Sequence, residues 1–337
     1  MGQVSSADVA ALAGVSRATV SYVINQTDGR RIGDATRQRV LDAAATLGYV
    51  PDSTARALRS GKTTVALLYL GFYGGDEPGP IPQLSGVGEM LQEALARGMR
   101  KAGKALLLWC DASRPLEEAL QSLTPCLVLA PLGLPDRARA AMEEAGVPVV
   151  TLAGGGNDPD ADRRSEAWAA GRLQIEHLVS RGHRRIGYIN VGGPRFDEMA
   201  SGRLGGAMEA SAENRIEPLH VFELPKPGSA TSDGIEAQLH TWVADGVTAV
   251  ACFNDIIAAR TLQAARTAEI QIPGHLALIG CDDEIIAALG QPPLTSVRFD
   301  VEATAQDLVA QCVAVLHGEP RPAQGPPQVK IVQRATT

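Results

Sequence analysis

The stretch "ADVAALAGVSRATVSYVINQ", residues 7–26, decides how the N-terminal part of this chain folds. It holds two short helical patterns separated by Gly-Val-Ser, and neither is long enough to be a stable helix by itself in water. Ser5 followed by Asp8 is a capping-box pattern that begins the first helix, and Gly14 supplies the positive φ that ends it. Two marginal helices that brace each other across a tight turn are typical of a helix-turn-helix.

The second helix of this stretch, which Ser16 can cap, has an apolar side and a polar side. The expected inward positions are Val20, Val23 and Ile24, facing Val9, Leu12 and Ala13 of the first helix. The outward positions are Arg17, Ala18, Ser21, Tyr22 and Asn25. The first three of these crowd the N-terminal half, where a DNA major groove can receive them. These twenty residues by themselves also fit an ordinary helical hairpin with a solvated face.

A third helix is expected in "GDATRQRVLDAAATLGY", residues 33–49. Its apolar positions are Val40, Leu41, Ala44 and Leu47, and Gly48 is its stop. This helix would close a three-helix core. The next stretch, "VPDSTARALRSGKTT", is too short and too polar to pack alone.

Charge is distributed unevenly along the 337 residues, whose formal net charge is −7. Residues 1–62 carry eight Lys or Arg and five Asp or Glu, a net charge of +3, so the rest of the chain carries −10. A chain with a net negative charge is poorly suited as a whole to bind nucleic acid, but its basic N-terminal part is suited to bind phosphate groups.

Several classes of protein are disfavoured by what the sequence lacks. No run reaches about 18 apolar residues, and no signal-peptide pattern is present, so no membrane partner is expected. The five cysteines are dispersed, which favours reduced thiols in a cytoplasm and no metal site. "RSGKTT" fails as a P-loop because Arg56 stands where the first Gly must be. No G-x-G-x-x-G follows the first strand and no G-x-S-x-G is present, so we expect no catalytic residue and no cofactor.

After Thr64 the pattern changes to apolar strands that alternate with amphipathic helices. The strand-like runs are "VALLYL", "ALLLWC", "CLVLAP", "VPVVTLA", "RRIGYINV", "AVACFN" and "LALIGCDD", and "VKIVQRATT" ends the chain as a final strand. Helical segments such as "EEALQSL", "RLQIEHLVSRG" and "RTLQAARTA" separate them. This alternation predicts an α/β body of two doubly wound lobes, in which helices cover both faces of each parallel sheet.

Polar and aromatic side chains cluster at the predicted carboxyl ends of the strands, where such sheets bind ligands. They are Phe72 and Tyr73, then Asn254 and Asp255, then Asp282 and Asp283. Carboxylates, an amide and a stacking ring suit a polyol or a sugar. A capping or turn role is the alternative for each of them; "CDDE" could simply cap the next helix.

The sequence resembles the lac repressor (LacI/GalR) family of bacterial transcription regulators. "DVAALAGVSRATVSYVIN" is similar to the family's D-V-A-x-x-A-G-V-S-x-x-T-V-S-x-V-x-N, and "TRQRVLDAAATLGYVPD" and "ARALRSGKT" follow in the family's order. In the body, "AGRLQIEHLVSRGHRRIGYI" and the run from "ACFNDIIAARTL" to "PPLTSVRFD" resemble the second lobe. The resemblance covers essentially the whole chain.

The resemblance implies roles for particular residues. The DNA contacts would be Ser5, Ser16, Arg17, Ala18, Thr19, Ser21, Tyr22 and Asn25, with a hinge helix that carries Ala55 and inserts Leu58 into the minor groove. The effector contacts would be Arg203, Asn254 and Asp282, joined by Phe72 and Tyr73. The implied domains are a DNA-binding domain 1–51, a hinge and linker 52–63, and an effector-binding and dimerisation body 64–337. Its lobes would be 64–165 with 298–324, and 166–297 with 325–337, resembling periplasmic sugar-binding proteins.

The resulting hypothesis is a sequence-specific DNA-binding regulator, in particular a repressor. It would bind a pseudo-palindromic operator as a homodimer, since no leucine heptads follow the final strand, and a small polar effector, a sugar, would modulate its affinity. The alternatives are a sugar-binding protein without DNA function, a regulator that has lost its effector response, and an α/β enzyme such as a nicotinamide oxidoreductase.

Overall fold

The computed structural model describes residues 4–24, 32–49, 63–69, 86–109, 116–131, 134, 136–151, 165–191, 197–224, 234–323 and 325–337. Contacts within the chain divide it into two units, Met1–Thr63 and Thr64–Thr337. We call them the head and the body.

In its described residues the head has the helices α1 (Ser6–Ala13), α2 (Arg17–Ile24) and α3 (Asp34–Leu47). The Asp8 carboxylate accepts hydrogen bonds from the backbone N–H of Ser5 at 2.8 Å and from its hydroxyl at 2.7 Å, so the predicted start of α1 is confirmed. Gly14 has φ 66° and Gly48 has φ 61°, both in the left-handed region that ends a helix. Both predicted helix stops are therefore confirmed.

The core of the head differs from the expectation at two leucines. Val9, Ala10 and Ala13 of α1 and Val40, Ala43 and Ala44 of α3 are buried, together with Val20 and Val23. Leu12 is 55% exposed and Leu41 is 42% exposed, so their predicted core positions are wrong. Each lies roughly 100° around its helix from the centre of the buried stripe. Small alanines fill that stripe and let the helices approach closely.

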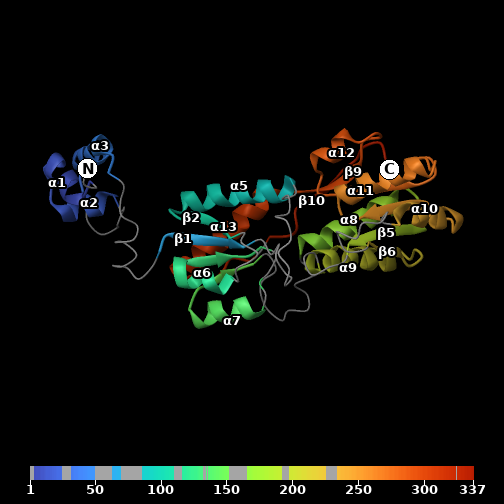
Figure 1. Cartoon of the computed structure of the whole chain (residues 1–337), viewed down its shortest axis with the longest axis horizontal. Helices are drawn as coiled ribbons and strands as arrows, with labels where there is room; N and C mark the ends of the chain where they lie inside the picture. The colour runs from blue at the N-terminus through green and yellow to red at the C-terminus, as the bar shows by residue number, and fades with distance from the viewer. Residues whose placement is uncertain are drawn as a thin grey trace. The chain divides into compact units, whose positions relative to one another are not determined.

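One sheet of the body has the strand order β2-β1-β3-β4, and all of its strands are parallel. Its strands are β1 (Val65–Tyr69), β2 (Ala105–Trp109), β3 (Leu127–Leu129) and β4 (Val149–Val150). One face packs against α5 (Gly86–Lys101) and α13 (Val301–His317), and the other against α6 (Leu116–Leu123) and α7 (Asp136–Glu144) (Figure 1).

The second sheet has the order β10-β9-β8-β7-β5-β6, with only β10 antiparallel to its neighbour. Its strands are β5 (Ile186–Val191), β6 (His220–Leu224), β7 (Ala249–Cys252), β8 (Ala277–Cys281), β9 (Thr295–Phe299) and β10 (Val329–Val332). One face of this sheet packs against α8 (Glu166–Ser180) and α9 (Asp197–Glu213), and the other packs against α10 (Ile235–Ala244) and α11 (Asp255–Thr267). The short helix α12 (Ile285–Leu289) follows β8. The two predicted α/β lobes are confirmed.

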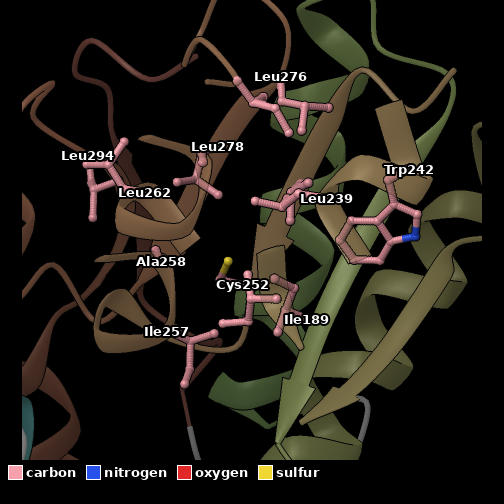
Figure 2. Packing of buried hydrophobic residues seen from close by; sticks show 14 of the residues in the cluster. Ile189, Leu239, Trp242, Cys252, Ile257, Ala258, Leu262, Leu276, Leu278 and Leu294 are labelled. Carbon is pink, nitrogen blue, oxygen red and sulfur yellow. The ribbon is translucent and has the colours of Figure 1, made fainter. Parts of the chain in front are cut away.

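The α10 and α11 side of this sheet is a continuous apolar core. Figure 2 shows Leu239 and Trp242 of α10 and Ile257 and Leu262 of α11 turned toward the strand residues. The rings of Trp242 and Phe222 form a T-shaped pair with a centroid distance of 6.4 Å. This packing fixes α11, whose first turn lies at the carboxyl ends of β7 and β8.

The opposite face depends on a glycine-mediated crossing of α8 and α9. A Cβ atom at Gly171 would lie 1.8 Å from the carbonyl oxygen of Arg203, and one at Gly206 would lie 2.0 Å from that of Trp168. Only glycine therefore allows the two backbones to approach this closely. The crossing sets the position of Arg203 on α9.

Two further findings concern the described part of the chain as a whole. No single helix within it is long and apolar enough to cross a membrane. Among the described residues, only the pair α1 and α2 taken together is long and apolar enough, and these two helices are bent by 102° at their break. Among the same residues, no group of three or more His, Cys, Asp or Glu side chains is placed to hold a metal ion.

Candidate DNA-binding and effector sites

The N-terminus of α2 is exposed. The Ser16 Oγ accepts the Thr19 backbone N–H at 3.1 Å and lies 2.9 Å from the Thr19 hydroxyl, so Ser16 caps the helix. Arg17 and Ala18 are exposed just after this cap, and Val20 is buried behind them. With the 102° bend between α1 and α2, this is helix-turn-helix geometry.

The other predicted DNA contacts have varied positions. Ser21 and Tyr22 are half-buried on α2. Ser5 is exposed, and its hydroxyl donates to Asp8. Hydrogen bonds from the side chain and backbone of Ser5 lower the pKa of Asp8. Asn25, Ala55 and Leu58 lie outside the described residues.

The body joins two of the predicted effector contacts in a buried ion pair. Nη2 of Arg203 lies 2.6 Å from Oδ1 of Asp282, and these side chains are only 3% and 8% exposed. Arg203 also donates from Nη1 to the Phe253 carbonyl. Burial is the strongest single effect and opposes the guanidinium charge, but the charge and hydrogen bond of Asp282, together with Cys281 and Tyr188, outweigh it, so the pKa of Arg203 is raised and its charge is retained.

Two aromatic rings flank this guanidinium. Its Cζ lies 4.7 Å from the centroid of Phe253 and 5.5 Å from that of Phe299. Arg203 is thus held by a carboxylate, a carbonyl and two ring faces at the carboxyl ends of β7, β8 and β9. Its orientation is set before any ligand arrives.

The third predicted contact, Asn254, caps α11. Its side-chain oxygen accepts the Ile257 backbone N–H at 3.0 Å, so the capping role considered as an alternative is present here. That role leaves the amide nitrogen as the group that Asn254 can offer to a ligand. Asp282, by contrast, does not cap α12, whose N-cap residue is Glu284. Phe72 and Tyr73 lie outside the described residues.

Sequence reasoning missed three of the four residues that support this site, namely Phe253, Phe299 and Ser296, and named the fourth, Asp255, only as a residue at a strand end. Phe253 and Phe299 flank Arg203, while Asp255 and Ser296 lie fully buried behind the turn that carries Asp282. Asp255 was expected beside a ligand at the end of its strand, whereas the structure buries it completely. For Ser296 no sequence signal exists.

A separate surface cavity of about 580 Å³ lies between α5 and the segments around Arg298 and Val329. Phe299 is the only one of the residues discussed above that lines it. Arg97 and Glu302 in its wall already pair at 3.1 Å and are both about half exposed. Charge and aromatic faces converge instead around Arg203, in buried surroundings.

A helix-turn-helix head joined to a two-sheet ligand-binding body defines a class of DNA-binding transcriptional regulators. Residues 7–52 match the family of bacterial regulatory proteins called the lacI family, and residues 175–337 match the periplasmic binding protein-like domain. The HTH-type transcriptional regulator GalR of Escherichia coli K12 is 32% identical over 94% of this chain and 90% of its own length. The HTH-type transcriptional repressor PurR of Aliivibrio salmonicida is 28% identical over 96% of both chains.

Solved structures agree on the fold. A lac repressor dimer bound to operator and the anti-inducer ONPF has a TM-score of 0.72 at 22% identity, with 99% of both chains covered. A complex of the regulator CelR with cellobiose has a TM-score of 0.65 at 24% identity, with 99% of this chain and 100% of that chain covered. The chain belongs to the lacI family of bacterial regulatory proteins, and it is a DNA-binding transcriptional regulator.

Proposed function

We propose that this regulator is a repressor that binds a pseudo-palindromic operator as a homodimer and that a neutral sugar sets its affinity. The observation that carries the proposal is the capped N-terminus of α2, where Arg17 and Ala18 are exposed while Val20 and Val23 anchor the helix. The dimer of the lac repressor on its operator supports the expected two-fold arrangement. The regulator would act in the cytoplasm, and we assign it no catalytic step.

The DNA contacts we propose among the described residues are Ser5, Ser16, Arg17, Ala18, Thr19, Ser21 and Tyr22. Arg17 is the one with a rigid donor fork that can read a guanine edge. Ser16 and Thr19 already bond each other at the helix start, so they suit phosphate contacts better than base contacts.

The effector contacts we propose are Arg203, Asn254 and Asp282. The buried pair is neutral as a unit, and the rings of Phe253 and Phe299 lie beside it. Such a site favours a neutral ligand with several hydroxyl groups and an apolar ring face over an anion, because Asp282 already neutralises Arg203. The cellobiose complex of CelR supports a sugar.

The test of DNA reading begins with selection of binding sites from a random duplex library by the full-length protein. Arg17→Ala should then weaken binding to the selected site by about 1–3 kcal/mol and binding to random DNA far less. Arg215→Ala, which removes an exposed arginine of the body, is the matched control and should change neither. Equal losses on both DNAs would restrict Arg17 to phosphate contact, and no enriched site at all would refute sequence-specific binding.

The test of the effector is a calorimetric screen of neutral mono- and disaccharides, with cellobiose, D-galactose and a nucleoside set included. A true effector should shift operator affinity by about 1–3 kcal/mol, and the operator should shift sugar affinity by the same factor. Asp282→Asn keeps the side-chain volume, removes the charge and should abolish the shift. A sugar that binds Asp282→Asn unchanged would refute the assignment, whereas a panel without effect would favour a regulator that has lost its response.

A further inference from the structure

The turn that carries Asp282 has an unusual backbone. Asp282 has φ 100° and Asp283 has φ 48°, although neither is glycine. L-residues adopt such angles rarely, and two in succession persist only where the surroundings hold them. The turn follows β8 directly and ends at Glu284, the N-cap residue of α12.

One carboxylate bonds to both sides of this turn. Asp255 is completely buried at the start of α11. Its Oδ2 accepts the backbone N–H of Glu284 at 2.7 Å, and its Oδ1 accepts the hydroxyl of Ser296 at 2.6 Å. The Ser296 Oγ in turn accepts the backbone N–H of Asp283 at 3.0 Å. The carboxylate therefore holds two consecutive backbone N–H groups, one directly and one through a hydroxyl.

The surrounding backbone is shaped to admit this carboxylate. A Cβ atom at Gly280, two residues before Asp282, would lie 2.0 Å from Oδ1 of Asp255. No side chain larger than hydrogen fits there, so the carboxylate packs directly on β8. The Asp282 N–H is fixed separately, since it donates to the Val297 carbonyl at 2.8 Å.

We propose that Asp255 is a positioning residue for the effector site, which holds the turn 282–284 so that the Asp282 carboxylate meets Arg203. The proposal rests on the proposed function only in taking Arg203 and Asp282 as ligand contacts. Asp255 touches neither the guanidinium nor, in our assignment, the sugar; it acts through the turn.

The charge of Asp255 supports a role beyond filling space. Burial raises its pKa to about 7, and the hydrogen bonds from Ser296 and Glu284 oppose that rise without cancelling it. The neighbouring carboxylates of Asp282 and Glu284 add to it. A carboxylate with a perturbed pKa beside a binding site is a recognised mark of function, and its hydrogen bonds to Ser296 and Glu284 are the contacts that hold the turn.

Two other carboxylates of the turn are paired, whereas Oε1 of Glu284 is buried without a hydrogen-bond partner and burial raises the pKa of that side chain. Asp282 pairs with Arg203, and the Asp283 carboxylate pairs with Arg298 of β9 and with Arg334, the latter at 2.7 Å. Asp255 and Glu284 are therefore the carboxylates of this cluster whose pKa is raised, that of Asp255 to about 7. Once Asp255 is protonated, its remaining carbonyl oxygen can still accept the Glu284 N–H while its hydroxyl donates to Ser296, so protonation by itself should keep both links to the turn.

Backbone hydrogen exchange of the full-length protein, resolved to residues 282–284, tests the proposal without any ligand. Asp255→Ala should accelerate exchange at Asp283 and Glu284 at least tenfold and leave β5 and β7 unchanged. Asp255→Asn is the matched control, since its oxygen can accept from Glu284 while its nitrogen donates to Ser296. It should retain the protection.

Three outcomes would overturn the proposal. Unchanged exchange in Asp255→Ala would show that the turn needs no support from the carboxylate. If exchange becomes faster across the whole second sheet, and the turn is accelerated no more than the strands, Asp255 stabilises the fold in general and does not position the turn. If Asp255→Ala does not fold, Ser296→Ala is the decisive variant. It should accelerate exchange selectively at the Asp283 amide, which the Ser296 hydroxyl accepts, and unchanged exchange there would refute the link through Ser296. None of these results depends on whether a sugar binds.

Discussion

Replacing Asp282 by alanine should destabilise the body by about 3–5 kcal/mol, because it leaves the Arg203 charge buried without its counterion. Arg203 is 3% exposed, and its distance to Asp282 is 2.6 Å, so water does not replace the lost partner. The Phe253 carbonyl and the two ring faces remain, which places the expected loss near the lower limit, about 3 kcal/mol.

A double-mutant cycle separates the ion pair from the space it fills. Arg203→Met with Asp282→Ala removes both charges and should cost less than the sum of the single variants by at least about 2 kcal/mol. Chemical unfolding followed by tryptophan fluorescence measures each variant, and Trp242 lies buried in the core of the second sheet. Only a changed midpoint at constant slope counts as a change of stability.

Glu143→Ala, which removes an exposed carboxylate from α7, is the control and should stay within about 0.5 kcal/mol of the wild type. A loss below about 1 kcal/mol in Asp282→Ala, or strict additivity in the cycle, would refute the reasoning. It would mean that Arg203 finds solvent or another partner without its aspartate.

Two further predictions concern the crossing of α8 and α9 and the start of α1. Gly171→Ala places a methyl group 1.8 Å from the Arg203 carbonyl oxygen, so it should lower the free energy of unfolding by about 3 kcal/mol. Gly202→Ala is the control. Its Cβ would lie 3.1 Å from that of Ala167, so the loss should be distinctly smaller. Similar midpoints for the two variants would contradict the close approach. The lowered pKa of Asp8 means that its contribution to the head is complete above the ordinary value of 3.8 and is lost as the pH falls through the folded value. NMR of the α1 amides between pH 5 and pH 2.5 should show this loss in the wild type and not in Asp8→Asn; identical acid profiles would exclude the contribution.

The sequence alone was sufficient for features that depend on a few neighbouring residues. The reciprocal contact of Ser5 and Asp8, the helix stops at Gly14 and Gly48, and most strands of the body are local, because a cap spans one turn and a parallel strand is a short apolar run. The sequence did not single out β6 or β9. Neither of them is a continuous buried run. The edge strand β6 alternates half-buried with exposed residues, and only three of the five residues of β9 are buried.

Tertiary structure decided the rest, because it depends on which distant segments meet. The bracing of α1 against α2 and α3 by alanines left Leu12 and Leu41 exposed, although their helical spacing looked apolar and inward. Arg203 and Asp282 are 79 residues apart, and their pairing requires the glycine crossing that brings α9 over the ends of the strands. The burial of Asp255 is likewise invisible in its own segment. It follows from Gly280 and Ser296, which the sheet brings to the same point, since a side chain's solvation is set by neighbours in space and not by neighbours along the chain.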